Sequence, residues 1–288
     1  MLNKYKKEEK HFIPFIMAGD PSESITIDLA LQLQKKGASV LELGVPYSDP
    51  LADGPVIQRA SLRARKNGMN IVKAIELGKK LKENGLKIPI ILFTYFNPVL
   101  KLGTNRFFAL MQQNDIDGLL IPDLPFEESE EVRRNCEVNG IDFISMVAPT
   151  SEKRIEMIAQ NATGFLYCVS SLGVTGERSQ FNHEIQSFLQ KVKTITSIPV
   201  VVGFGVSNRK QVESFYRMSD GVVVGSAIIR KIEELLPLLQ DEDTKQKGLL
   251  QFELFLDDLL NIKGRRGVSH ESERTVNEVE PLPTGKAD

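Results

Sequence analysis

Short apolar runs alternate with amphipathic segments along most of the chain. The runs are rich in β-branched and aromatic residues, which is typical of buried strands. Eight such runs are present, at residues 13–17, 40–43, 88–93, 118–121, 143–147, 165–169, 199–202 and 221–224.

The segments between the runs predict helices. The clearest helical spacing of apolar positions is that of Ile185, Phe188, Leu189, Val192 and Ile195. Two further helices are expected after the last run, at residues 228–239 and 249–260.

Continuous apolar strands that alternate with helices indicate an α/β protein with a parallel sheet covered by helices. Eight strand-helix units at about thirty-residue spacing favour a single (β/α)8 TIM barrel of parallel strands with outer helices. An open doubly wound sheet is the alternative. Glycine pairs after the seventh and eighth runs favour the barrel, because such barrels commonly bind phosphate there.

We expect residues 1–262 to form one TIM-barrel catalytic domain. Residues 263–288 are polar and are expected to be a disordered C-terminal tail, because they bury too little apolar area. Segment 46–68 is a long connection stiffened by prolines, which suggests a functional loop rather than disorder. Segment 170–180 contains two glycines and resembles a mobile lid.

Composition excludes several classes of protein. The chain of 288 residues has 36 basic and 38 acidic residues, so no overall charge draws it to nucleic acid or to a membrane surface. No apolar stretch reaches transmembrane length and no signal peptide is visible, so a cytoplasmic protein is expected. The two cysteines, Cys136 and Cys168, lack metal-ligand spacing.

The histidines do not indicate a metal site, because they lie far apart and outside the apolar runs. Surface or capping roles are expected for all three, His11, His183 and His270.

Glu42 lies inside the second apolar run, where a charged group is unfavourable unless it is paired or used in chemistry. If Leu41 and Leu43 face the surrounding helices, Glu42 points to the interior of the barrel. A core ion pair is the alternative role, but the other seven runs contain no Lys or Arg. A buried carboxyl has a raised pKa and suits a general acid or base.

Asp53 follows on the connection after the second run, within Ala-Asp-Gly-Pro. Its carboxylate could accept a hydrogen bond from a ligand. The residues alone favour a local turn or cap, which this sequence also supports.

A second group of residues indicates a phosphate site. Gly203, Phe204 and Gly205 follow the seventh run, and Gly225 with Ser226 follows the eighth. Glycines let backbone N–H groups approach an anion, and a helix that begins at Ser226 would direct its positive end toward it. Each pair alone is also compatible with a tight turn.

Several motifs of the chain resemble those of the tryptophan synthase alpha subunit family. They are residues 14–21, 41–55, 173–176, 203–205 and 225–227, and the resemblance extends over about residues 12–262. It implies retro-aldol cleavage of indole-3-glycerol phosphate to indole and glyceraldehyde 3-phosphate, without a cofactor in this subunit. Glu42 matches the glutamate that moves protons, and Asp53 matches the aspartate that binds the indole N–H.

The resemblance also implies the substrate contacts. Positions around the indole pocket are matched by Phe15, Tyr95, Tyr167 and Phe204. The lid threonine that closes toward Asp53 is matched by Thr175. The phosphate contacts are matched by Gly176, Gly205, Gly225 and Ser226.

The implied partner is a pyridoxal-phosphate beta subunit, which receives indole in an alpha2-beta2 heterotetramer. Segment 47–50 and the loop near Asp123 would face it. The chain departs from the family in a short leader before Phe12 and in the extra tail after Lys263.

Three other functions stay open from the residues. The chain could be another phosphate-binding barrel enzyme, such as a sugar-phosphate epimerase or isomerase, which would not need Glu42 together with Asp53. It could be a non-catalytic subunit that activates a partner, although Glu42 and Asp53 argue against this. It could also be a stand-alone lyase that releases free indole.

Overall fold

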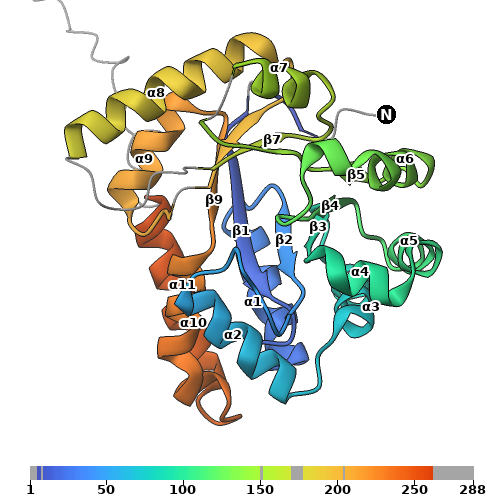
Figure 1. Cartoon of the computed structure of the whole chain (residues 1–288). Coiled ribbons are helices and arrows are strands. Elements are labelled where there is room, and N and C mark those ends of the chain that lie inside the picture. The colour runs from blue at the N-terminus through green and yellow to red at the C-terminus, as the bar shows by residue number, and fades with distance from the viewer. Residues whose placement is uncertain (1–4, 8, 150–151, 170–177, 204, 262–288) are drawn as a thin grey trace, which may run out of the picture.

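A computed structural model describes residues 5–7, 9–149, 152–169, 178–203 and 205–261. Nine parallel strands form one curled sheet in the order β5-β4-β3-β2-β1-β9-β8-β7-β6, and helices surround it (Figure 1). The strands are β1 (His11–Met17), β2 (Leu41–Gly44), β3 (Ile90–Phe93), β4 (Gly118–Leu120), β5 (Asp142–Phe143), β6 (Met146–Val147), β7 (Leu166–Cys168), β8 (Val200–Val202) and β9 (Gly221–Val224).

The helices lie between the strands and after the last one. They are α1 (Glu23–Lys35), α2 (Pro55–Lys66), α3 (Ile71–Glu83), α4 (Phe96–Leu102), α5 (Thr104–Gln113), the short 3₁₀ helix η1 (Phe126–Glu128), α6 (Glu130–Val138), α7 (Glu152–Gln160), α8 (Arg178–Ile195), α9 (Arg209–Met218), α10 (Ser226–Leu239) and α11 (Lys245–Leu260).

Side-chain caps fix the starts of several helices. Ser22 accepts the Ile25 N–H at the start of α1, and Asn70 accepts two backbone N–H groups at the start of α3. Asn208 caps α9 in the same way. Each cap satisfies N–H groups that have no partner within the helix, so these helices begin where the polar cap residue stands.

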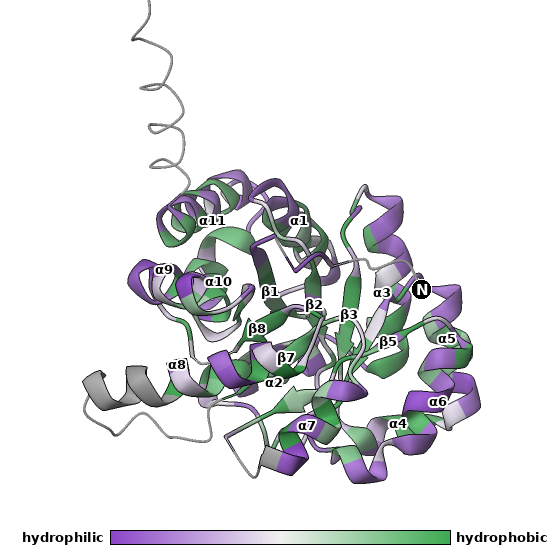
Figure 2. Cartoon of the chain, turned by 90° about the horizontal axis from the view of Figure 1, so that it is seen from above, coloured by the Kyte–Doolittle hydropathy of each residue, from purple (hydrophilic) through white to green (hydrophobic). Residues whose placement is uncertain are grey.

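Two apolar layers make up the core. The larger layer fills the space between the sheet and the helices, and Figure 2 shows hydrophobic residues concentrated on the strands in the centre of the molecule. The smaller layer lies on the inner side of the curled sheet and comprises Tyr5, Ile13, Val40, Ile91, Leu120, Ile144, Phe165, Val201 and Val223. Because strand neighbours face opposite sides, the runs are apolar throughout.

Seven of the eight expected strands are each observed as one strand, with ends within two residues of the expected ones. The expected strand 143–147 is instead two short strands, β5 and β6, separated by Ile144 and Ser145. β5 pairs with β4 and β6 pairs with β7, so these two residues join the two outer strands of the sheet.

The long connection 46–68 differs from the expected irregular loop, because residues Pro55–Lys66 form helix α2. Pro55 occupies the first turn, where its missing N–H does no harm. The expected helices after the last strand are confirmed as α10 and α11.

Two residues near the N-terminus, Tyr5 and His11, are buried. His11 belongs to β1 and is buried, with Nε2 2.8 Å from the Lys6 carbonyl oxygen, so the expected surface or capping role is wrong. Tyr5 is also buried, and its ring packs edge-on against Phe165 with centroids 5.6 Å apart. The short leader thus places an aromatic ring in the inner core layer.

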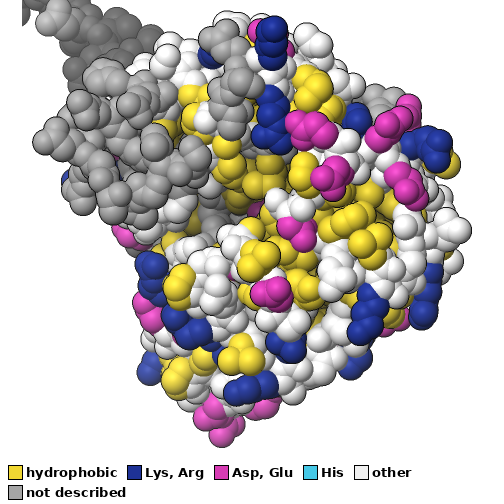
Figure 3. All heavy atoms as spheres, in the orientation of Figure 1, with side chains coloured by type: hydrophobic (Ala, Val, Ile, Leu, Met, Phe, Trp, Pro, Cys, Tyr) yellow, Lys and Arg dark blue, Asp and Glu magenta, His cyan; other side chains and the backbone are white. Residues whose placement is uncertain are grey.

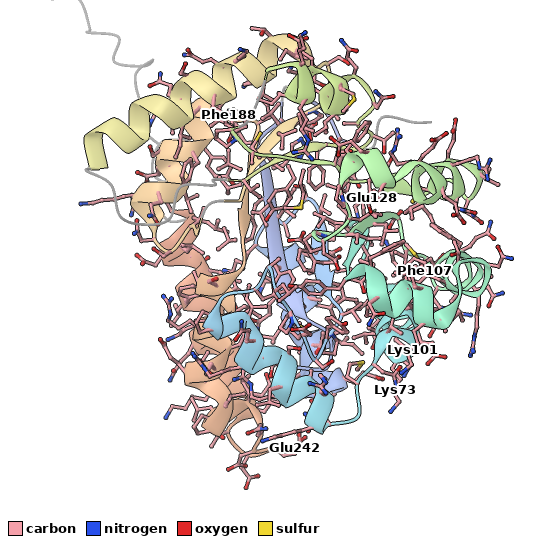
Figure 4. All side chains as sticks on the ribbon, in the orientation of Figure 1. Lys73, Lys101, Phe107, Glu128, Phe188 and Glu242 are labelled. Carbon is pink, nitrogen blue, oxygen red and sulfur yellow. The ribbon has the colours of Figure 1, made fainter. Side chains whose placement is uncertain are left out.

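The outer faces of the helices are mostly polar. Figure 4 shows Lys73, Lys101 and Glu242 at the periphery, and all three are exposed, whereas Phe107 and Phe188 are buried. On the face drawn in Figure 3, hydrophobic side chains gather over the middle with acidic side chains among them. Among the described residues, no helix is long and apolar enough to cross a membrane.

Two expectations fall on residues outside the described ranges. The tail 263–288 is one of them, and residues 170–177 of the expected lid are the other. The last three residues of the expected lid, 178–180, belong to α8.

Candidate active site

A cavity of about 230 Å³ opens at the carboxyl ends of the parallel strands. Nearly every strand or the turn after it contributes to its wall, which is the usual position of an active site in a curled parallel α/β sheet. The lining residues are Phe15, Glu42, Ala52, Asp53, Gly54, Ile57, Phe93, Pro122, Met146, Tyr167, Val169, Gly203, Gly205, Val206, Val223, Gly225 and Ser226.

Glu42 lies in the middle of β2 and is 3% exposed. Its neighbours Leu41 and Leu43 pack in the outer core layer, so the predicted inward direction of Glu42 is confirmed. Burial, and then the negative charge of Asp53, raise the pKa of Glu42 to about 8. No Lys or Arg of the described residues pairs with it, which contradicts a core ion pair. Its carboxyl can therefore hold or release a proton near neutral pH.

Asp53 stands at the end of the connection before α2 and faces the same cavity as Glu42. Its backbone carbonyl accepts a hydrogen bond from the Gln58 side chain at 2.8 Å, and its N–H donates to the Pro50 carbonyl at 3.0 Å. The carboxylate is half-buried, and this burial raises its pKa to about 6. The local turn is present, but the side chain is directed to the cavity rather than used as a cap.

Tyr95 supports Asp53 through hydrogen bonds. Its hydroxyl hydrogen-bonds with the Asp53 carboxylate, which opposes the rise of the Asp53 pKa, and it accepts the Ala52 N–H at 3.0 Å. Tyr95 is 2% exposed and does not itself line the cavity. Tyr95 therefore supports Asp53, and its expected contact with indole stays a prediction.

Aromatic rings form one wall of the cavity. Phe15 and Phe93 meet edge-to-face with centroids 5.5 Å apart, and Phe93 meets Tyr95 in the same way at 6.2 Å. Gly44 leaves room for this wall, because a Cβ atom there would lie 2.5 Å from the Phe15 ring. The wall suits a flat apolar group such as an aromatic ring.

Tyr167 lies on β7 and its side chain is on the inner side of the sheet. Burial, and then the charge of Glu42, raise the pKa of Tyr167 well above its usual value, so its hydroxyl stays protonated. Gly203 packs against its ring so closely that an added Cβ would collide with it. Tyr167 thus packs on the turn after β8 and lines the same cavity as Glu42.

The turns after β8 and β9 bring backbone N–H groups to the cavity. Gly205 has a φ of +52°, a conformation that favours glycine. Gly225 is the N-cap of α10, and the described residues provide no side-chain cap for it. The free N–H groups of the first turn of α10 and the positive end of its dipole are suited to an anion.

Within the described residues, no group of three or more His, Cys, Asp or Glu side chains could hold a metal ion. The chemistry that the cavity offers comes from one proton-carrying carboxyl, one carboxylate that accepts hydrogen bonds, an aromatic wall and an anion site. This combination suits a phosphorylated substrate with an aromatic end and a bond cleaved by proton transfer.

Most of the predicted site residues meet at this cavity. It brings together Phe15, Glu42, Asp53, Tyr167, Gly205, Gly225 and Ser226. Thr175, Gly176 and Phe204 lie outside the described residues. Sequence reasoning missed Phe93, Pro122 and Met146, although each stands at or near a predicted strand end, where barrel active sites are built.

The chain is similar to known proteins in sequence and in structure. The family model described as tryptophan synthase alpha chain matches residues 1–259. The tryptophan synthase alpha chain of Bacillus pumilus is 63% identical over 247 residues, which are 86% of this chain and 92% of that relative.

Solved structures agree with the sequence relatives. The tryptophan synthase subunit alpha from Legionella pneumophila is 32% identical, with a TM-score of 0.79 over 90% of this chain and 94% of that one. A chain of the tryptophan synthase a2b2 complex from Pyrococcus furiosus is 31% identical, with a TM-score of 0.73 over 89% and 99%. The family match over residues 1–259 and the 63% identical relative establish that the chain belongs to the tryptophan synthase alpha chain family.

Proposed function

We propose that the chain cleaves indole-3-glycerol phosphate to indole and glyceraldehyde 3-phosphate as the alpha subunit of tryptophan synthase. The observation that carries this proposal is a single cavity in which unpaired Glu42 faces Asp53 near the N-terminus of α10. A sugar-phosphate epimerase would use the anion site but has no need for the aromatic wall and Asp53.

Glu42 carries the protons in the proposed reaction. Protonation of indole C3 gives the indolenine-like tautomer. Removal of the proton from the adjacent glycerol hydroxyl then forms the aldehyde as the C–C bond breaks, and the bonding electrons return to the indole ring. A carboxyl with a pKa of about 8 is suited to both transfers near neutral pH.

Asp53 accepts the indole N–H and stabilises the positive charge that develops on the ring nitrogen. Tyr95 fixes the Asp53 carboxylate in place. The indole ring packs between Phe15, Phe93 and the Tyr167 side of the cavity. Phe204 and the lid residue Thr175 are proposed to complete this pocket.

The phosphate binds at the turns after β8 and β9. The backbone N–H groups of Gly205, Gly225 and Ser226 are the proposed donors, with Gly176 added from the lid segment. The α10 dipole supports this site because the helix is fourteen residues long and begins at Ser226.

We further propose a pyridoxal-phosphate beta subunit as partner in an alpha2-beta2 assembly, to which indole passes. The Pyrococcus furiosus a2b2 complex supports this, because one of its chains shares the fold of this protein. Residues 47–50 and the loop at Asp123 are proposed to face the partner, and Leu51, which is 82% exposed beside them, is apolar and free to be covered.

The test of the proposed function is an indole-release assay on the purified chain, with and without a beta subunit. Glu42→Gln keeps the size of the side chain and removes the titrating group, so we expect turnover to fall by at least ~10²-fold while ligand binding persists. Asp53→Asn is expected to impair turnover as well. Near-wild-type cleavage by Glu42→Gln would reject the assignment.

The sheet is proposed to be an eight-stranded barrel in which residues 142–147 act as one interrupted strand. The Ile144 N–H donates to the Leu119 carbonyl of β4 at 2.9 Å, and the Ser145 carbonyl accepts the Tyr167 N–H of β7 at 3.0 Å. This segment can thus join both edges of the sheet. A crystal structure in which either set of bonds is missing would argue for an open sheet.

Residues 1–262 are proposed to form the catalytic domain, with 263–288 outside it. The family match, which ends at residue 259, supports this boundary. We also propose a cytoplasmic location. The buried, unbridged thiols of Cys136 and Cys168 are compatible with a reducing compartment.

A further inference from the structure

Helix α2 determines where Asp53 stands, because the helix begins only two residues after it. The connection before α2 is fastened to the same helix at its other end. The Ser61 hydroxyl accepts the Tyr47 N–H and donates to the Tyr47 carbonyl, both at 3.0 Å. The loop that carries Asp53 is therefore attached to α2 at both ends, through Tyr47 and through Pro55, and must follow any displacement of this helix.

Arg63 connects α2 to the turn after β1. Its Nε lies 2.7 Å from one carboxylate oxygen of Asp20, and a second guanidinium nitrogen lies 2.8 Å from the other oxygen. The Asp20 side chain is 0% exposed. Two parallel charge-assisted bonds in a buried place fix direction as well as distance, which a single point charge does not do.

The same guanidinium also reaches helix α10. Its remaining terminal nitrogen donates to Glu233 at 2.6 Å, and Glu233 is held from the other side by Arg59. Arg59 and Arg63 are one turn apart on α2 and share a face. Figure 1 shows α2 beside α10, and the two helices are in contact.

Glu233 lies on the helix that begins at the proposed phosphate site. It follows Ser226 by two helical turns, so the two residues lie on similar faces of α10. One guanidinium thus ties together the helix that positions Asp53 and the helix that presents its N-terminus to the phosphate.

We propose that Arg63 is a positioning residue that sets the span between Asp53 and the phosphate site by locking α2 to α10 and to the β1–α1 turn. The inference rests on the proposed function, because Asp53 and the α10 N-terminus hold opposite ends of one substrate. A misplacement of about 1 Å can lower turnover up to about 100-fold, so a rigid connection between the two subsites has a kinetic effect.

The test is a double-mutant cycle between Arg63→Lys and Asp53→Asn, measured by indole release from indole-3-glycerol phosphate. Lysine keeps the charge but cannot form the fork to Asp20 and reach Glu233 at the same time. We expect kcat to fall by about 10-fold or more in the wild-type background. In the Asp53→Asn background the same change should lower kcat by less than about 2-fold, because the two residues act as a unit.

Arg154→Lys is the matched control, because Arg154 forms a similar two-bond ion pair with Glu127 on the exposed surface. It should keep wild-type kcat and KM. An equal loss for Arg63→Lys in both backgrounds would mean a general structural effect and would overturn the proposal, as would unchanged kinetics.

Glu233→Gln keeps the test valid if Arg63→Lys does not fold. It weakens only the link to α10 and leaves the buried pair of Arg63 with Asp20 intact. Like Arg63→Lys, it should lower kcat in the wild-type background and have little effect on kcat in the Asp53→Asn background. Additive losses for this variant would overturn the proposal. If the wild-type chain released no indole, the proposed function would fail and this inference with it, whereas unchanged Arg63→Lys kinetics in an active enzyme overturn this inference alone.

Discussion

The Tyr95 hydroxyl joins the Asp53 carboxylate to the backbone of the residue before it, because it also accepts the Ala52 N–H at 3.0 Å. Tyr95 follows β3 by two residues, and Asp53 lies on the connection after β2. The two hydrogen bonds of Tyr95 therefore fasten the connection after β2 to the end of the neighbouring strand. Asp53, the proposed acceptor of the indole N–H, is thus held by Tyr95, which does not itself line the cavity.

Tyr95→Phe should move the acidic limb of the pH profile of kcat/KM to higher pH. The hydrogen bond from Tyr95 lowers the pKa of Asp53, so its loss raises that pKa above its present value of about 6. Because the carboxylate form accepts the indole N–H, activity then begins at a higher pH. We expect a shift of roughly half to one unit, read from indole release between pH 5 and 8.

Tyr47→Phe is the control for this change. The Tyr47 ring lies 5.3 Å from that of Tyr95, but its hydroxyl accepts a hydrogen bond from Asn97. Its profile in the isolated chain should match the wild type. A Tyr95→Phe profile with an unmoved acidic limb would contradict the support role.

Glu42→Gln should stabilise the protein more at pH 9 than at pH 5. Burial raises the pKa of Glu42 from 4.5 to about 8, so between these values the folded state holds a proton that the unfolded state has released. The wild type therefore loses stability as pH rises through this window, and the amide removes this loss. Urea unfolding of both proteins at the two pH values measures the difference.

Glu76→Gln on the exposed side of α3 serves as the control for the loss of one carboxyl group from the protein. Asp53 titrates in both proteins and cancels from the comparison. Parallel stability curves for Glu42→Gln and the wild type would show that Glu42 is ionised in the folded state at neutral pH.

Gly203→Ala should destabilise the protein by about 1–3 kcal/mol and lower turnover, because the new methyl group collides with the Tyr167 ring. Gly54→Ala is the comparison for stability, since a Cβ there meets nothing within 4 Å and φ is −74°. Equal unfolding free energies for the two variants would disprove the close packing of Gly203 on Tyr167.

Removal of the residues after Lys263 should leave the melting temperature nearly unchanged. The last described helix, α11, ends at Leu260 and is capped by Asn261 in a left-handed conformation. A fall of many degrees in a thermal scan would show that the tail packs on the domain. Truncation after Gln251 is the opposite control, because it deletes the buried Phe252, Leu256 and Leu259 and should abolish folding.

The positions of the strands could be predicted from the sequence because each strand is buried on both faces. Such a strand reads as an uninterrupted apolar run, as in Val200–Val202 and Gly221–Val224. Helix α2 could not be predicted in this way. Half of its twelve residues are polar or charged, and its buried residues are the small Ala60, Ser61 and Ala64, so only a weak apolar stripe marks it. Ion pairs such as Arg63 with Asp20 help to hold it in place.

The burial of isolated residues could not be predicted from the sequence either. Tyr5 stands in a polar leader and yet is buried against Phe165, since a single ring needs no periodic pattern to enter a core. The split of residues 142–147 into β5 and β6 also depends on neighbours, because each half pairs with a different strand.

The sequence by itself determined that Glu42 points inward and needs a chemical reason to be there, because strand neighbours alternate faces and no cation stood in the other runs. The local sequence pattern also marked the glycine turns before α9 and α10. Only the tertiary structure decided that the Asp53 side chain faces the same cavity as Glu42 rather than capping its own turn. That outcome depends on where α2 and the connection before it lie. Tyr95 holds the connection through the Ala52 N–H, and Asp20 and Glu233 hold the helix through Arg63. These partners are distant in sequence, so no local pattern specifies their contacts.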